Sequence, residues 1–131
     1  MTLEVPGYYP KQYPVQFLTQ TLPISLSFIR SHLASSPNSH IAILCKDGKD
    51  LSVGIATAAL ALYFDDDGKS VVGKNGTEVG GGQLNKDIIR RRLQWVLSSR
   101  AGANPARATL KRINEYLMSP NRPSLQNIST I

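Results

Sequence analysis

The pattern of apolar and polar residues predicts several helices and one short strand. Apolar residues at positions 26, 29 and 33 predict a short amphipathic helix over residues 24–33. The uninterrupted apolar run 41–44 is typical of a central strand that is buried on both faces. Residues 53–64 are apolar almost throughout and too few to span a bilayer, so they predict a helix that is buried on all sides.

Two more helices are predicted in the C-terminal part. Asn85 is a typical N-cap for a helix that runs to about residue 98, with Asp87 in the first turn at the positive end of the helix dipole. Asn104 followed by Pro105 is a second start signal, a cap and then a proline at the first helical position. This last helix is expected to run to about residue 118, with apolar residues on one face and charged residues on the other.

Proline and glycine divide the chain into segments. Residues 1–23 contain four prolines and three tyrosines, which predicts an extended arm or linker. Residues 24–118 form the predicted domain, and six of the ten glycines fall in a loop at 68–82 within it. Residues 119–131 are a polar tail.

Length and cysteine content exclude several classes of protein. A chain of 131 residues is expected to form one domain. The single cysteine excludes an internal disulfide and a multi-cysteine zinc site, so a reducing compartment is expected, the cytoplasm or else the nucleus. No apolar run approaches the roughly 20 residues of a membrane span, so no membrane partner is expected.

The charge distribution predicts a polyanionic partner. The net charge is +6, and residues 85–112 hold eight of the fifteen cations against a single acid, Asp87. A basic patch of this density is typical of nucleic-acid-binding proteins, although a solvated helix surface would show the same pattern. The candidate RNA-binding residues are Lys86, Arg90, Arg91, Arg100, Arg107 and Lys111.

The loop between the predicted strand and the buried helix, residues 45–52, is the candidate chemical site. Such a loop directs unpaired backbone N–H groups and the positive end of the helix dipole at one point, which suits a phosphate. Gly48 permits close approach of the backbone to an anion, and Lys46 and Lys49 are plausible phosphate contacts. The spacing of a Walker loop is absent, and an ordinary strand-to-helix turn is the alternative.

This strand, cysteine, loop and helix resemble the phosphate-binding loop of cysteine-dependent and dual-specificity phosphatases, His-Cys-x5-Arg-Ser/Thr. Cys45 and Ser52 match that pattern, whereas Leu44 stands at the histidine position and Leu51 at the arginine position. No leucine can hold phosphate oxygens as an arginine does. The only acid before the loop is Glu4, so the family's aspartic general acid is also missing, and phosphatase activity is not expected.

A closer resemblance is to the C-terminal domain of the tRNA 2′-O-ribosylphosphate transferases, over about residues 22–118. This resemblance implies an α/β fold like that of dual-specificity phosphatases, with a central, mostly parallel sheet flanked by helices. Since only one strand is clear, further strands are expected from residues 15–22 or from the glycine-rich loop. The matching stretches are residues 43–45, 47–54, 64–66, 85–90, 95 and 99–110.

The resemblance also implies a reaction and its partners. Members of this family transfer phosphoribose from 5-phosphoribosyl 1-pyrophosphate to a 2′-hydroxyl in the T-stem of initiator tRNA. They are several times longer and carry a large N-terminal domain, which is therefore an expected partner. The alternative is a catalytically inactive pseudo-phosphatase module that binds tRNA or a partner domain.

Roles for the loop residues follow from that donor. Asp47 and Asp50 would repel a bare phosphate, but a pyrophosphate donor arrives with Mg²⁺, and carboxylates beside phosphates hold this ion. Asp50 is the candidate Mg²⁺ ligand, and either aspartate could take the proton from the 2′-hydroxyl. A turn-forming role for Asp47 and a helix cap for Asp50 are the structural alternatives. The donor phosphates would be bound along the rest of the loop by Cys45, Lys46, Gly48, Lys49, Leu51 and Ser52.

Arg92 is the exceptional basic residue. On a helical wheel it falls inside the apolar arc, between Ile88 and Val96. A buried cation needs a partner, which is here either a structural carboxylate or a phosphate of the donor. Arg92 is therefore also a candidate donor-binding residue.

Overall fold

Helices form most of the described chain. The computed structural model describes residues 2–7, 9–36, 38–73 and 84–119. Its elements are α1 (Pro14–Gln16), the π-helix η1 (Phe17–Thr21), α2 (Leu22–Ser35), α3 (Leu51–Tyr63), α4 (Lys86–Ser99) and α5 (Arg107–Met118).

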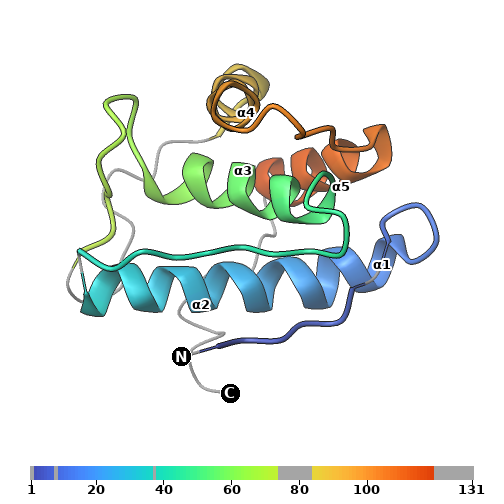
Figure 1. Cartoon of the computed structure of the whole chain (residues 1–131), viewed down its shortest axis with the longest axis horizontal. Coiled ribbons are helices and arrows are strands. Elements are labelled where there is room, and N and C mark those ends of the chain that lie inside the picture. Colours follow the sequence, from blue (N-terminus) through green and yellow to red (C-terminus); the bar gives the residue numbers. More distant parts are fainter. Residues whose placement is uncertain (1, 8, 37, 74–83, 120–131) are drawn as a thin grey trace.

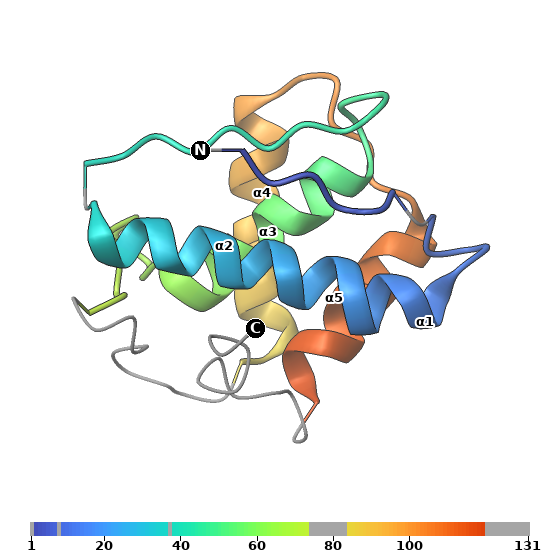
Figure 2. The same cartoon turned by 90° about the horizontal axis from the view of Figure 1, so that it is seen from below.

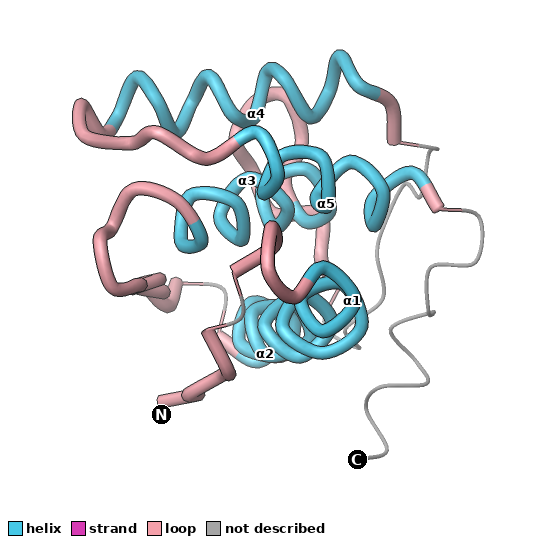
Figure 3. The backbone as a smooth tube through the Cα atoms, turned by 90° about the vertical axis from the view of Figure 1, so that its right-hand side faces the viewer, coloured by secondary structure: helices cyan, strands magenta, loops and turns pink. Residues whose placement is uncertain are grey.

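The helices are arranged in three layers around α3. In Figures 1 and 3, α1, η1 and α2 form one rod at the bottom, α3 and α5 lie above it, and α4 lies on top. The view from below in Figure 2 shows α5 crossing behind this rod. Helix α3 contacts α2, α4 and α5. Eleven of its thirteen residues are buried, which confirms the prediction of a helix that is apolar on all sides.

The predicted central parallel sheet is wrong for the described residues. They contain no strand of a sheet, and Phe64 and Ser70 form an isolated antiparallel bridge. Residues 41–44 are extended beside α2, but Leu44 is 89% exposed, so this segment is not buried on both faces. A strand needs a neighbour to satisfy its backbone groups. The segment 15–22, which was expected to supply one, is helical, and residues 74–83 of the glycine-rich loop lie outside the described residues.

The expected extended arm is helical from Pro14 onward. Pro14 is in the first turn of α1, where a missing N–H breaks no hydrogen bond. Pro23, which would break a regular α-helix, is the second residue of α2 and comes just after the π-helical turn of η1. The prolines therefore mark the start and the irregular turn of one long helical rod.

Close packing of α3 on α5 depends on a glycine. A Cβ atom at Gly54 would lie 2.7 Å from Thr109 Cγ2 and 3.5 Å from Ile113 Cγ1. Both contacted residues are fully buried on the inner face of α5, as the apolar face of that helix predicts. Gly54 thus lets the two helices, and the loops that precede them, approach one another.

The two predicted helix starts have different outcomes. The N-cap at Asn85 is confirmed, because its Oδ1 accepts a hydrogen bond of 3.0 Å from the backbone N–H of Ile88. The start at Asn104-Pro105 is wrong by two residues: α5 begins at Arg107, and its N-cap residue, Ala106, has no side-chain oxygen. The missing cap is supplied by a residue of another loop.

Candidate functional site

Two loops meet at the N-terminal ends of α3 and α5. The first, residues 45–50, precedes α3, and the second, residues 100–106, precedes α5. The backbone N–H of Asn104 donates to the carbonyl of Lys49 at 2.9 Å. The side chain of Arg100 donates from Nε to the carbonyl of Gly48 at 2.8 Å. The candidate site is therefore built from both loops rather than from the first alone.

Cys45, the first residue of the first loop, directs its thiol at Asp47 in the loop and at Ser52 in the first turn of α3. It is half-buried, and its Sγ is 3.0 Å from Ser52 Oγ and 3.3 Å from Asp47 Oδ1. Burial raises the pKa of the thiol and Asp47 also raises it, but hydrogen bonds from the Ser52 side chain and from the amides of Ser52 and Gly48 bring the pKa below its ordinary value. The start of α3 thus favours a negative charge at this point.

Asp47 shapes the same loop through its own carboxylate. Its Oδ1 accepts the backbone N–H of Lys49 at 2.9 Å and that of Asp50 at 3.3 Å. The amide of Lys49 and then the thiol of Cys45 hold the pKa of this carboxyl below its usual range. This is the Asx-turn geometry expected of a turn-forming aspartate. It also means that two of the backbone donors expected to bind phosphate are occupied by a carboxylate.

Asp50 caps a helix, but not the one that follows it. Its Oδ1 accepts the backbone N–H of Ala106 at 2.8 Å and the hydroxyl of Thr109 at 2.6 Å. No side-chain cap bond joins it to α3. Asp50 therefore supplies the cap that Ala106 cannot provide for α5, across a sequence separation of 56 residues. Thr109 was not among the candidates, and only its position on the inner face of α5 could have indicated a role.

Arg100 brings a guanidinium to a loop that has no arginine of its own. A Cβ atom at Gly48 would lie 2.7 Å from Arg100 Nη2, so the guanidinium lies directly against this glycine. Gly48 has a φ of +68°, a backbone conformation that glycine adopts without strain. Leu51, at the family's arginine position, is buried in the core, and Ser52 is buried as well. Lys46 and Lys49 are exposed beside the loop.

Arg92 lies at the other end of α3. The helix has thirteen residues, so its two ends are about 20 Å apart. Arg92 is 3% exposed and donates to the carbonyls of Leu60 and Phe64, both at 3.3 Å. Its Nη1 lies 2.9 Å from Asp66 Oδ1 outside hydrogen-bond geometry, so this contact is an ion pair. Arg92 therefore has a structural carboxylate as its partner, and the first loop is out of its reach.

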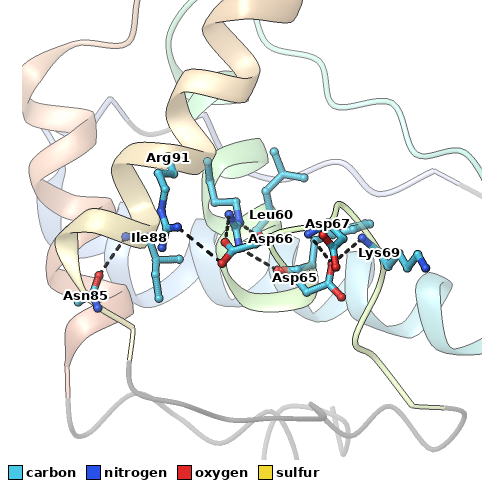
Figure 4. A network of polar contacts seen from close by, with 10 residues as sticks. Leu60, Asp65, Asp66, Asp67, Lys69, Asn85, Ile88 and Arg91 are labelled. Atoms are coloured by element: carbon cyan, nitrogen blue, oxygen red, sulfur yellow. Dashed lines mark hydrogen bonds and ion pairs between the residues drawn. The ribbon is translucent and has the colours of Figure 1, made fainter.

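The acidic turn after α3 is part of the same structural network. Figure 4 shows Asp66 beside Leu60 and Arg91, and Arg91 Nη1 is 3.6 Å from Asp66 Oδ2. Asp65 accepts the backbone N–H groups of Asp67 and Lys69 at 3.0 and 2.9 Å. These aspartates close a turn and neutralise arginines of α4.

No preformed metal centre is found in the described ranges. No three His, Cys, Asp or Glu side chains come together there in a group that could hold a metal ion. The carboxylate of Asp50, the candidate Mg²⁺ ligand, is directed at α5. Among the described helices, none is long and apolar enough to cross a membrane.

Comparison with models of protein families gave a match. A family model named Init_tRNA_PT, described as the Rit1 DUSP-like domain, matches residues 10–117. Comparisons with the curated proteins and with the solved structures gave no match. The match covers most of the chain, both loops of the candidate site and all of α2 to α4, and it confirms the resemblance to the initiator tRNA enzymes.

Proposed function

Since the chain belongs to the Rit1 DUSP-like domain family, whose name connects it with initiator tRNA modification, we propose that it is the C-terminal part of a phosphoribosyl transferase. The transferase would move phosphoribose from 5-phosphoribosyl 1-pyrophosphate to a 2′-hydroxyl in the T-stem of initiator tRNA. The chain would act together with the N-terminal domain of a longer protein, in the cytoplasm, and would have no phosphatase activity.

One observation supports a role in holding the donor. The thiol of Cys45, the start of α3 and the guanidinium of Arg100 converge on one exposed loop. Backbone amides and a helix N-terminus attract a phosphate, and an arginine adds directed N–H donors. In the described part of the chain, Arg100 uses only Nε in a hydrogen bond, so its Nη groups can donate to a ligand.

In the proposed reaction, the 2′-hydroxyl oxygen attacks the anomeric carbon of the donor. The bond from that carbon to pyrophosphate breaks, pyrophosphate takes the electron pair, and the hydroxyl proton passes to a carboxylate. Asp47 is the more accessible candidate for this proton, because its side chain is exposed at the loop. Asp50 would position the second loop, because its Oδ1 already accepts two hydrogen bonds from α5.

In the proposed reaction, Mg²⁺ would enter the site bound to the donor. The described residues hold no dedicated cluster of ligands, and Mg²⁺ usually keeps several waters and binds substrate phosphates with one or two carboxylates. The ion would therefore be held mainly by the pyrophosphate. No step assigned to this chain passes through it.

The test is a transfer assay. The chain, alone and mixed with the N-terminal domain of a longer family member, is incubated with Mg²⁺, initiator tRNA and donor labelled in its 5-phosphate. We expect label in initiator tRNA and none in a tRNA with a 2′-deoxy T-stem. Arg100→Gln should reduce transfer at least tenfold, because a lost charged hydrogen bond is worth about 1.5–3 kcal/mol. Arg90→Gln, with the same charge change away from the loop, should not.

A binding module without catalysis is the second candidate, and one contact favours it. The carboxylate of Asp47 occupies the N–H groups of Lys49 and Asp50, which a phosphate would otherwise use. If label never reaches tRNA while the chain still binds initiator tRNA or the N-terminal domain, transfer by this site is contradicted. The module would then serve recognition alone.

A further inference from the structure

The structure sorts the cations of residues 85–112 into two groups. Four of the eight are ion-paired within the chain: Arg90 with Asp87, Arg91 and Arg92 with Asp66, and Arg112 with Glu115. The other four, Lys86, Arg100, Arg107 and Lys111, have no carboxylate partner in the described residues. Sequence alone could not separate the two groups.

Three of these four cations line one groove. It lies between the start of α4 and the outer side of α5, and it has a volume of about 700 Å³. Lys86 comes from α4, and Arg107 and Lys111 come from successive turns of α5. Leu110 and Met118 add partly buried apolar surface.

Among the described residues that line the groove, the one acid is neutralised. Glu115 also lines it, but Arg112 Nη1 lies 2.8 and 2.9 Å from the two carboxylate oxygens of Glu115. The groove therefore has three positive charges that no described carboxylate neutralises. Like charges that gather on one shallow surface raise the local potential and concentrate an anionic partner.

We propose that this groove between α4 and α5 binds the sugar–phosphate backbone of RNA. The proposal deepens the function above and rests on it only for the identity of the RNA. Lys86, Arg107 and Lys111 would contact phosphates, and the apolar surface of Leu110 and Met118 would pack against sugars. The described residues that line the groove offer no aromatic side chain for base stacking, and contacts to phosphates and sugars carry no sequence information, so we expect binding without regard to sequence.

The site is separate from the candidate donor loop. Arg100, the fourth cation without a carboxylate partner in the described residues, contacts Gly48 and does not line the groove. The described cations of residues 85–112 without a carboxylate partner thus fall into two regions, one beside the Cys45 loop and one on the outer side of α5. The first suits a small phosphate compound, and the second suits an extended polyanion.

The test uses the whole chain and the salt dependence of binding. The groove variant is Lys86→Gln/Arg107→Gln/Lys111→Gln. The control is Lys69→Gln/Arg90→Gln/Arg91→Gln, which removes the same charge outside the groove. Affinity for initiator tRNA and for a 20-nucleotide poly(U) is measured by fluorescence anisotropy from low to moderate salt. All six positions are exposed, and circular dichroism should confirm that both variants fold.

Loss of three phosphate contacts should reduce the slope of log K against log salt by about 2–3. We expect this reduction, with at least a tenfold weaker affinity at low salt, for the groove variant with both RNAs. The control should keep its slope. If both variants lose slope equally, binding follows net charge and the groove is not the site. An unchanged groove variant overturns the proposal as well.

Two more polyanions distinguish RNA binding from general attraction to negative charge. Vesicles with 30% phosphatidylserine and poly-glutamate are compared with poly(U) under the same conditions. If the substitutions of the groove variant weaken binding to the vesicles or to poly-glutamate as much as they weaken binding to poly(U), the groove is a general polyanion site and the assignment to RNA is wrong. Failure of the proposed transfer would appear differently, as wild-type RNA binding with the full salt slope but no labelled tRNA.

Discussion

The two ends of helix α3 both meet an arginine, and the two arginines differ in burial and in their partners. At the C-terminal end, Arg92 is buried, lies 4.3 Å from the ring centre of Trp95, and has two carbonyls and one carboxylate as partners. At the N-terminal end, Arg100 is exposed and its side chain donates to the carbonyl of Gly48. One arginine completes the fold, and the other is available to a ligand.

This difference shows how an arginine with a structural role can be distinguished from one that can bind a ligand. Burial of a charge is costly unless partners satisfy it, so a buried arginine that is held by carbonyls and a carboxylate has little capacity left for a substrate. An exposed arginine that uses only one of its donors within the described chain, as Arg100 uses Nε, has that capacity. The sequence left two partners open for Arg92, a structural carboxylate or a donor phosphate; the structure shows the carboxylate of Asp66, and the arginine that lies beside the loop is Arg100.

The largest expected effect tests this contrast directly. Arg92→Ala should lower the free energy of unfolding by about 2–4 kcal/mol, because it leaves a cavity and removes the partners of two carbonyls and of Asp66. Arg100→Ala should change stability by only about 0.5 kcal/mol, as exposed substitutions do. Urea unfolding followed by fluorescence of Trp95 gives both values. Equal losses for the two variants would contradict the contrast.

An intermediate effect is expected at Asp50. Asp50→Ala removes the cap of α5 and the acceptor for the fully buried Thr109, so it should cost about 1–2 kcal/mol. Asp50→Asn keeps an oxygen at that position and should cost much less. If the asparagine variant is as stable as wild type but a full-length enzyme that carries it does not transfer phosphoribose, the charge of Asp50 has a catalytic role besides its cap.

The smallest effect concerns the pH dependence of Cys45. Since its pKa lies below the ordinary value, alkylation by iodoacetamide should reach its half-maximal rate at a lower pH in the folded chain than in urea. Ser52→Ala should move this midpoint up, because the Ser52 hydroxyl lowers the pKa, and Asp47→Asn should move it down, because Asp47 raises the pKa. Because the pKa of Cys45 is lower in the folded chain than in the unfolded chain, ionisation of the thiol stabilises the fold at pH values above the pKa of a free thiol. This contribution is lost as the pH falls through the pKa of the folded chain. Identical midpoints in folded and unfolded chain would contradict the lowered pKa.

The sequence by itself determined helices α3, α4 and α5 and the family. Each of these helices has a local signal: the apolar run of α3, the asparagine cap of α4 and the two-faced pattern of α5. Each helix begins and ends within about two residues of the predicted positions. Motifs around Cys45 and between residues 99 and 110 identified the family that the comparison confirmed. Local patterns of this kind act over one or two helical turns, so they can be read from the order of residues alone.

Only the tertiary structure decided which of these residues work together. The run 41–44 has the composition of a buried strand, yet pairing depends on a distant neighbour, and the segment 15–22 forms a helix instead. Asp50 caps α5, and Arg100 reaches Gly48, across separations of 56 and 52 residues. Likewise, the composition of residues 85–112 does not reveal which cations form ion pairs. Only the positions of Asp66, Asp87 and Glu115 in the fold distinguish the ion-paired cations from the others. Contacts between distant segments depend on how the helices pack, and no local pattern encodes that.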